Sequence, residues 1–240
     1  MHTLFISDLH LCPTRPAIND IFFRFLAHEA RQAEALYILG DLFEYWAGDD
    51  DLADPFNASV CVALKNLAAS GVKIFFMAGN RDFLIGADFA RAAGLTLLDE
   101  PLLLELYGQP TLVMHGDTLC TDDHAYMKFR TEARTPQWKA NMLALPLAAR
   151  KTKIEEMRRQ SEVAKSGKSA EIMDAHPGAI AESLRNHGYP RLIHGHTHRP
   201  KLHLHKVDGY HCERWVLTDW YAHGGYLSCD ETGCYAHTLA

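Results

Sequence analysis

The chain has 240 residues, which suits one domain with a full hydrophobic core and room for a small insertion. Hydrophobic residues make up 48% and charged residues 22%, as in ordinary globular proteins, and the net charge of −6 argues against a general nucleic-acid binder. Histidine is abundant, with 15 residues, and because imidazole is the commonest metal ligand this excess indicates a metal site. No stretch approaches about 18 apolar residues and no basic export signal follows Met1, so we expect a cytoplasmic protein.

The first half of the chain alternates predicted strands with predicted helices. Short apolar runs at residues 4–6, 36–39 and 72–77 each end at a polar or glycine residue, as buried strands do. Apolar residues recur at helical spacing over residues 18–26 and 56–67. This rhythm predicts a parallel or mixed sheet covered by helices.

The second half is richer in strands. Residues 102–106 and 111–114 flank a predicted hairpin turn, and residues 192–193 form a short buried strand. The tail over residues 201–239 predicts three or four strands, with turns at Asp208-Gly209, Gly224-Gly225 and Thr232-Gly233. The expected fold is therefore α/β, an α+β sandwich of two packed mixed sheets flanked by helices.

Residues 121–168 interrupt this pattern and predict a helical cap, inserted over the active site between core segments 1–120 and 169–240. From residue 128 to 168 there are eleven Lys or Arg and four Asp or Glu, a net charge of +7. The same segment contains Trp138, Met142, Leu143, Leu145 and Leu147. Apolar groups beside basic groups favour a lipid-like anionic ligand; the alternative is an ordinary solvated helical face over core leucines.

Six cysteines are scattered without a C-x-x-C pair, and we interpret them as reduced thiols in a reducing compartment. They are Cys12, Cys61, Cys120, Cys212, Cys229 and Cys234. A disulfide between Cys229 and Cys234 across a hairpin is the alternative.

Side chains of metal-ligand type follow the ends of the predicted strands. They are Asp8, His10, Asp41, Asn80, His115, His196 and His198. Because the carboxyl ends of strands in α/β sheets collect ligands at one edge, these groups can converge. Oxygen and nitrogen donors without thiolate favour Mn, Fe, Co or Zn, and a carboxylate such as Asp41 can bridge two cations about 3.5–4 Å apart.

The order of these motifs carries more information than any one of them. D-x-H, G-D-x-x-E, G-N-x-D, H-G-D and G-H-x-H follow one another along almost the whole chain, which resembles the calcineurin-like metallophosphoesterase family. The resemblance implies two divalent cations, with Mn²⁺ expected. It implies that one cation binds Asp8, His10 and His198, that the other binds Asn80, His115 and His196, and that Asp41 bridges them. His194 lies outside the motif, so we expect a structural role for it.

Position 81 indicates which type of phosphoester bond is cleaved, because most members of the family carry His where this chain has Arg81. An alkoxide leaving group needs a proton, whereas the phosphate monoester released from a diphosphate has a second pKa near 6 and needs charge neutralisation instead. Arginine provides a fixed cation with a bidentate fork. Arg81 therefore points to diphosphate cleavage; the alternative is a structural ion pair between Arg81 and Asp82.

Longer strings over residues 40–51, 115–123 and 193–200 resemble one branch of the family, the UDP-2,3-diacylglucosamine pyrophosphatases of lipid A synthesis. The resemblance implies attack at the α-phosphorus, giving UMP and 2,3-diacylglucosamine 1-phosphate, by a peripheral protein on the cytoplasmic face of the Gram-negative inner membrane. It implies catalytic roles for Asp41, Asn80, Arg81 and His196. The substrate contacts that we expect are Asn80, Arg81, Asp123, Tyr126, Ser161, Lys165, Lys168 and His196. Ala78 and Lys165 depart from the branch, which often has His and Asn there.

Three other function classes stay open. A soluble nucleotide pyrophosphatase or phosphomonoesterase would use the same ligands but would not need a basic and apolar cap. A non-catalytic scaffold is disfavoured because every expected ligand type is present. Nucleic-acid binding is disfavoured because the basic segment has few aromatic residues and no recognised motif. We expect no obligate protein partner.

Overall fold

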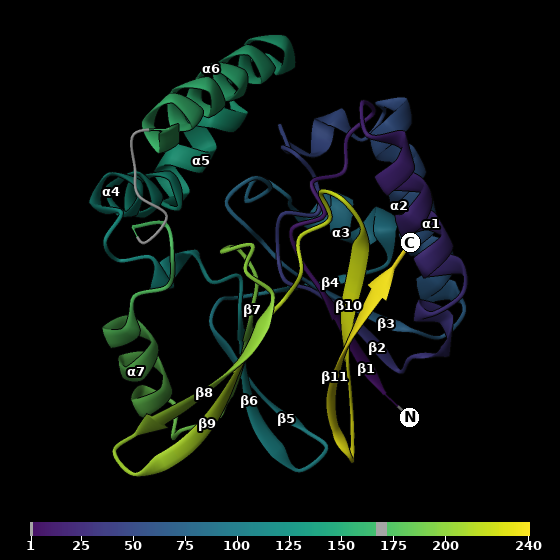
Figure 1. Cartoon of the computed structure of the whole chain (residues 1–240). Coiled ribbons are helices and arrows are strands. Elements are labelled where there is room, and N and C mark those ends of the chain that lie inside the picture. The colour runs from purple at the N-terminus through teal and green to yellow at the C-terminus, as the bar shows by residue number, and fades with distance from the viewer. Residues whose placement is uncertain (1, 167–171) are drawn as a thin grey trace.

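The computed structural model describes residues 2–166 and 172–240, and its first sheet has six strands. Their spatial order is β11-β10-β1-β2-β3-β4 (Figure 1). The strands are β1 (Thr3–Ile6), β2 (Ala35–Ile38), β3 (Lys73–Met77), β4 (Thr96–Leu98), β10 (Gly224–Asp230) and β11 (Gly233–Leu239). Strands β1 to β4 run parallel, so their carboxyl ends meet at one edge, while β10 joins β1 in antiparallel fashion.

The second sheet has five strands in the order β5-β6-β7-β9-β8. They are β5 (Leu102–Leu106), β6 (Gln109–Met114), β7 (Arg191–His194), β8 (Lys201–Val207) and β9 (Tyr210–Val216). A buried cluster joins the facing surfaces of the two sheets, with Phe5 and Met77 from the first and Leu112 and Ile193 from the second. Strands β6 and β7 run parallel, and their carboxyl ends lie at the same edge as those of the first sheet, since Nδ1 of His115 after β6 is 2.8 Å from the Leu39 carbonyl after β2.

Helices cover the outer face of the first sheet. They are α1 (Pro16–Ala27), α2 (Pro55–Ala69) and α3 (Ala87–Ala93). Proline at the first turn starts α1 and α2, and the Asp54 carboxylate caps α2 by accepting from the Phe56 backbone N–H at 2.9 Å. Apolar residues at helical spacing in α1, including Phe22 and Phe25, are fully buried against the sheet.

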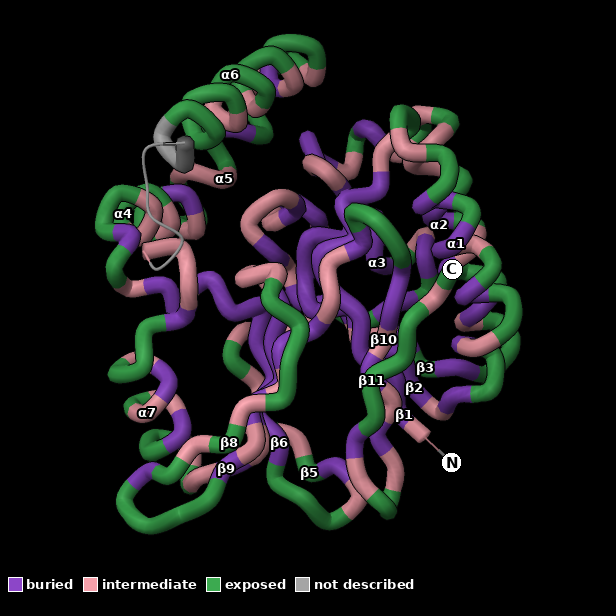
Figure 2. The backbone as a smooth tube through the Cα atoms, viewed as in Figure 1, coloured by how far each residue is buried: buried purple, intermediate pink, exposed green. Residues whose placement is uncertain are grey.

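Three further helices, α4 (His124–Ala133), α5 (Pro136–Leu143) and α6 (Leu147–Ser166), lie beside the loops at the carboxyl ends of the strands (Figure 1). Figure 2 shows that the central strands, such as β1, β2 and β7, are largely buried, whereas α6 is mostly exposed. Arg150 of α6 is only 1% exposed and lies 2.5 Å from Asp50, and Lys151 lies 2.7 Å from Asp51. Ion pairs to the core therefore hold α6 in place.

Most sequence-based predictions of the elements are confirmed, including the α/β class and the two mixed sheets. The short helix α3, strand β4 and helix α7 (Pro177–Asn186) were missed. Helix α7 had a readable signal, since Pro177 precedes Ile180 and Leu184 at i, i+4 spacing. The turn predicted at Gly224-Gly225 is wrong, because these residues begin β10 and pair with β11.

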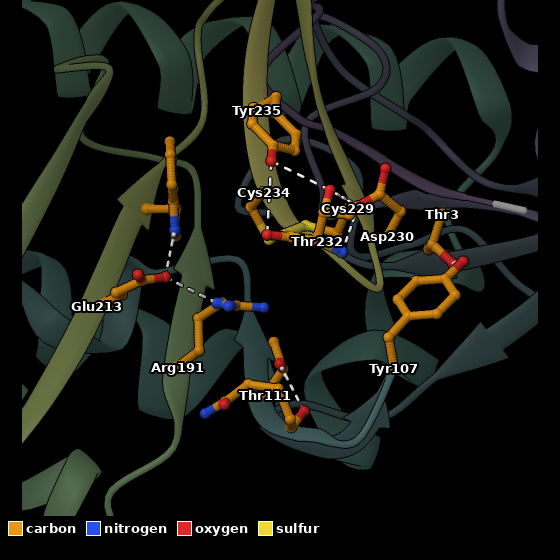
Figure 3. The surroundings of a disulfide bond; sticks show 12 residues. Thr3, Tyr107, Thr111, Arg191, Glu213, Cys229, Asp230, Thr232, Cys234 and Tyr235 are labelled. Carbon is orange, nitrogen blue, oxygen red and sulfur yellow. Dashed lines mark hydrogen bonds and ion pairs between the residues drawn. A yellow bond between two sulfur atoms is a disulfide. The ribbon is translucent and has the colours of Figure 1, made fainter.

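The prediction that all cysteines are reduced is wrong for two of them. Cys229 and Cys234 form a disulfide across the β10–β11 hairpin (Figure 3). The register of the two strands places the two cysteines directly opposite each other, with Cα atoms 4.1 Å apart. This geometry allows a disulfide, so the expectation of reduced thiols, which rested on a reducing compartment, fails for this pair. The other four cysteines are free thiols. Within the described residues, no helix is long and apolar enough to cross a bilayer.

Candidate metal centre and active site

The candidate ligands lie in loops at the common carboxyl edge of the strands, and several have unusual backbone conformations. Five of them have positive φ angles: Asp8 (56°), His10 (49°), Asp41 (54°), His196 (68°) and His198 (53°). A residue other than glycine in this region costs about 1–3 kcal/mol, so strain of this kind clusters at functional sites. Here it turns the side chains that follow separate strands towards one another.

Two glycines allow the loops to approach closely. A Cβ atom at Gly79 would lie 2.1 Å from Oδ1 of Asp41, and one at Gly195 would lie 2.2 Å from Oδ2 of Asp8. Both distances are impossible contacts, so only glycine fits at these positions. The G-N-x-D and G-H-x-H motifs therefore begin with glycine because the aspartates pack against its backbone.

One donor group consists of Asp8, His10 and His198, whose ligand atoms lie within 4.8 Å of one another. Nε2 of His198 is 3.3 Å from Oδ1 of Asp8. Oδ1 of Asp8 and both ring nitrogens of His10 are buried without a hydrogen-bond partner in the described part of the chain. Buried polar atoms normally have a partner, so Oδ1 of Asp8 and one ring nitrogen of His10 fit a cation, while the other ring nitrogen carries the proton of the neutral imidazole.

A second donor group consists of Asp8, Asp41 and His115. Nε2 of His115 lies 3.8 Å from Oδ1 of Asp41 and 3.1 Å from Oδ1 of Asn80. Nδ1 of His115 is 2.8 Å from the Leu39 carbonyl and donates to it, which leaves Nε2 as the acceptor that a metal requires. The His196 ring centroid is 5.0 Å from that of His115, so His196 borders this group.

Asp41 stands between the two groups, with Oδ2 3.9 Å from Nε2 of His10 and Oδ1 facing His115. Burial raises the pKa of Asp41 to about 7, against the opposing attraction of His115. Burial opposes protonation of His115, but the neighbouring carboxylates, led by Asp41 and Asp8, raise its pKa to about 9. Buried carboxylates that draw protons in this way need positive charge, which divalent cations would supply.

Asp82, whose role the sequence did not indicate, joins two of the site loops. Its fully buried carboxylate accepts from the backbone N–H groups of Leu42 (2.7 Å), Gly79 (2.8 Å) and Asp41 (3.3 Å). The alternative of an ion pair between Arg81 and Asp82 is therefore wrong. The only signal in the sequence was the fixed aspartate that ends the G-N-x-D motif.

Arg81 is held beside the metal-ligand cluster. Its backbone N–H donates to Oδ1 of Asp41 at 2.8 Å, and its guanidinium lies 3.9 Å from the Glu44 carboxylate. Glu44, which ends the G-D-x-x-E motif but had no role assigned from the sequence, also lies 3.5 Å from Nδ1 of His10 and accepts from Arg158 of α6. Glu44 thus links a candidate ligand, Arg81 and a helix of the 121–168 segment.

A third missed residue, Asp117, connects the site to α4. It is fully buried, accepts from the Tyr126 hydroxyl, and lies 2.8 Å from Nε of Arg130. Arg130 also donates to Glu100 at 3.0 Å, and Glu100 accepts from the His115 backbone N–H. This network ties α4 to the loop that carries His115.

The predicted substrate contacts do not all come together. Asp123 is 9% exposed and caps α4, since it accepts from the Tyr126 backbone N–H at 3.0 Å. The Tyr126 ring lies 6.0 Å from that of His196, while Ser161 is exposed on α6. The Lys165 side chain and Lys168 lie outside the described residues.

His194 is buried and engaged in other contacts. Its Nδ1 lies 2.8 Å from the Gly195 carbonyl, and its Nε2 lies 3.1 Å from a guanidinium nitrogen of Arg214. Burial, reinforced by the Arg214 charge, lowers the pKa of His194 to about 3. The ring is therefore held neutral as a support for the loop with Gly195.

Comparison with known proteins agrees with this geometry. The family described as calcineurin-like phosphoesterase matches residues 1–200. A UDP-2,3-diacylglucosamine hydrolase of Aromatoleum aromaticum is 54% identical over 233 residues, covering 97% of this chain and 95% of that protein. One of Stenotrophomonas maltophilia is 49% identical and covers 100% of this chain and 99% of its own. Among solved structures, an archaeal phosphodiesterase has a TM-score of 0.48 at 13% identity, with both chains fully covered. The chain belongs to the calcineurin-like phosphoesterase family.

Proposed function

We propose that this chain hydrolyses UDP-2,3-diacylglucosamine at the α-phosphorus, giving UMP and 2,3-diacylglucosamine 1-phosphate, as a step of lipid A biosynthesis. The observation that carries the proposal is the 54% identity, over 97% of the chain, to a protein named as a UDP-2,3-diacylglucosamine hydrolase. Arg81 beside the ligand cluster supports it, because diphosphate cleavage needs a fixed cation at the leaving phosphate.

Membership of the family implies divalent metal binding, and the donor set fits it. We assign Asp8, His10 and His198 to one cation, Asn80, His115 and His196 to a second, and Asp41 to both, with Mn²⁺ as the expected ion. When bound, such cations neutralise phosphoryl charge and lower the pKa of a coordinated water. The Asp41 position between the groups supports a shared role.

The chain's own residues orient the diphosphate. The Arg81 backbone is anchored on Asp41 and its side chain is only 14% exposed, so the guanidinium is positioned before substrate arrives. The His196 backbone N–H donates to Asp8 at 2.8 Å, which fixes the ring between His115 and Tyr126. We propose that Arg81 and His196 stabilise negative charge that develops on the phosphoryl and leaving oxygens.

We propose that residues 121–168 form a helical cap over this site. Five of its cations pair with core acids: Arg130, Arg134, Arg150, Lys151 and Arg158. These ion pairs hold the cap on the core. The exposed apolar side chains Phe129 and Leu143 offer surface to acyl chains and to a membrane. A peripheral location on the cytoplasmic face of the inner membrane follows from that substrate.

The test is hydrolysis in detergent micelles with Mn²⁺, comparing UDP-2,3-diacylglucosamine with UDP-N-acetylglucosamine and p-nitrophenyl phosphate. We expect turnover of the diacylated substrate alone, loss of turnover on chelation, and oxygen-18 from labelled water in UMP. Equal turnover of the soluble esters would reject the lipid substrate, and label in the lipid phosphate would reject attack at the α-phosphorus.

Arg81→Ala tests the catalytic assignment. We expect kcat/KM to fall about 100-fold, as for the loss of a charge-stabilising group. Arg91→Ala is the matched control, because Arg91 is 77% exposed and pairs with Asp88 of the same helix. Similar losses in both variants would contradict the role of Arg81.

A further inference from the structure

A cavity of about 310 Å³ lies on the second sheet, next to the loop between His196 and His198. Its lining includes three cationic side chains and one carboxylate. The residues that matter here are Asp174, Thr197, Arg199, Lys201, His203 and Arg214. None of them belongs to the donor groups of the candidate metal centre.

The register of strands β8 and β9 explains why cations converge here. His203 of β8 lies directly opposite Arg214 of β9, and Lys201 lies opposite Val216. Residues two apart on a strand share a face, so Lys201, His203 and Arg214 stand on the same side of the ribbon. The cavity is therefore built on a basic face of a rigid hairpin.

Arg214 is the unusual member of this face. It is 6% exposed, and its guanidinium contacts two imidazoles, with Nε 3.1 Å from Nε2 of His205 and Nη1 3.1 Å from Nε2 of His194. Within residues 2–166 and 172–240, no carboxylate forms an ion pair with it. A buried guanidinium without a counter-ion is costly, and burial lowers the pKa of Arg214 accordingly.

The one acid among the described lining residues does not neutralise this charge by direct contact. Asp174 forms its ion pair with Arg199, and it attracts Arg214 only at longer range. Arg214 and Lys201 in turn lower the pKa of His203, after the larger effect of burial, which indicates a positive field in the cavity. Among the described lining residues, positive charges therefore outnumber negative ones.

An unpaired hydroxyl lies at the same place. Oγ1 of Thr197 is buried and has no hydrogen-bond partner within the described residues. A hydroxyl can donate to an anion oxygen, and most buried hydroxyls have a partner. A guanidinium without a counter-ion and an unpaired hydroxyl therefore border one cavity.

We propose that this cavity binds a phosphate-type oxyanion, held by Arg214, Lys201 and the Thr197 hydroxyl, separately from the candidate metal centre. The phosphate group comes either from a free phosphomonoester or from the headgroup of an anionic phospholipid, since both present the same oxygens. Because Thr197 lies between His196 and His198, the occupied cavity restrains the loop that carries two candidate ligands. This site goes beyond the proposed hydrolysis and does not depend on it.

The experiment is titration calorimetry of the full-length chain with inorganic phosphate, with and without EDTA. Binding that persists in EDTA belongs to the cavity, whereas binding that EDTA removes belongs to the metal centre. Lys201→Ala is expected to weaken the persistent binding about tenfold, and Arg214→Gln at least as much, since each removes a charge-assisted hydrogen bond. Lys206→Ala is the matched control, because Lys206 lies on the same strand but on its opposite face.

A second arm identifies the source of the phosphate group. A lipid headgroup is supported if vesicles of phosphatidylglycerol bind the wild type, release it when phosphate is added, and bind the Lys201→Ala variant only weakly. Phosphate binding without vesicle binding supports a free phosphomonoester. Absence of phosphate binding in EDTA, or equal weakening by Lys206→Ala, overturns the proposal. Lys201 is exposed, so this variant keeps the test valid even where Arg214→Gln does not fold.

Discussion

Asp82→Asn tests whether one buried carboxylate holds the loops of the site together. Oδ2 of Asp82 accepts from the Leu42 N–H at 2.7 Å, and Oδ1 accepts from Gly79 at 2.8 Å and from Asp41 at 3.3 Å. An asparagine of the same shape keeps one oxygen, which can still accept from Gly79 and Asp41. Its amide nitrogen then faces the Leu42 N–H, so two donors oppose each other.

The size of the effect follows from these contacts. A buried backbone N–H without an acceptor costs about 1–3 kcal/mol. Burial raises the pKa of Asp82 against the opposing backbone hydrogen bonds, so removal of the charge recovers part of that cost. We expect a net loss of about 2 kcal/mol in the free energy of unfolding, which lowers Tm by about 4–8 °C for a chain of this size.

Thermal unfolding followed by circular dichroism measures this loss, and manganese titration of the same variant measures the effect on the site. Because the clamped loops carry Asp41 and Asn80, Asp82→Asn should also weaken metal binding. Asp88→Asn is the control: its side chain is 69% exposed and pairs with Arg91 within one helix, so it should change stability by less than about 0.5 kcal/mol. Equal Tm values for the two variants would refute the clamp.

Three further predictions concern metal, the cap contact and pH. Saturating Mn²⁺, at about 100 times its dissociation constant, should stabilise the wild type by about 2.7 kcal/mol in thermal melts, and a similar rise in Asp8→Asn would contradict the ligand assignment. A double-mutant cycle of Glu44→Ala and Arg158→Ala in urea unfolding should give a coupling of about 1–2 kcal/mol, because the pair is partly buried; additive losses would reject the link. The folded-state pKa of His194 is about 3, below its ordinary value of 6.5. Between these two pH values the unfolded chain binds a proton at His194 that the folded chain does not bind, so the free energy of unfolding falls as pH drops from 6.5 towards 3. His194→Asn should flatten this slope by up to about 1.4 kcal/mol per pH unit, and an unchanged slope would assign it to other groups.

Local patterns in the sequence determined much of the fold. Apolar runs that end at a polar or glycine residue located β1, β2 and β3, and helical periodicity located α1 and α2, because both signals depend on neighbouring residues only. Elements with weak local signals were missed, such as the seven-residue helix α3 and the three-residue strand β4. Their stability comes from packing against β3 and α2, which no local pattern contains.

The residue types of the site were also predictable from the sequence, since strand ends in a parallel sheet place Asp8, Asp41 and Asn80 at one edge. Their supports were not. Asp82 and Glu44 act through partners far away in the chain, namely Leu42 and Arg158, and Asp117 acts through Tyr126 of the separate helix α4. An acidic residue in a motif looks the same whether it binds a metal, caps a loop or pairs with a helix, and only the tertiary contacts distinguish these roles.

The cysteines and the basic segment show the same division. The sequence determined a hairpin around Thr232-Gly233, but only the strand register placed Cys229 opposite Cys234. It likewise determined the net charge of +7 over residues 128–168, whereas the tertiary structure paired Arg150 with Asp50 and Lys151 with Asp51. Charge and periodicity are properties of a segment, but an ion pair or a disulfide depends on the distance between two segments, and that distance exists only in the folded chain.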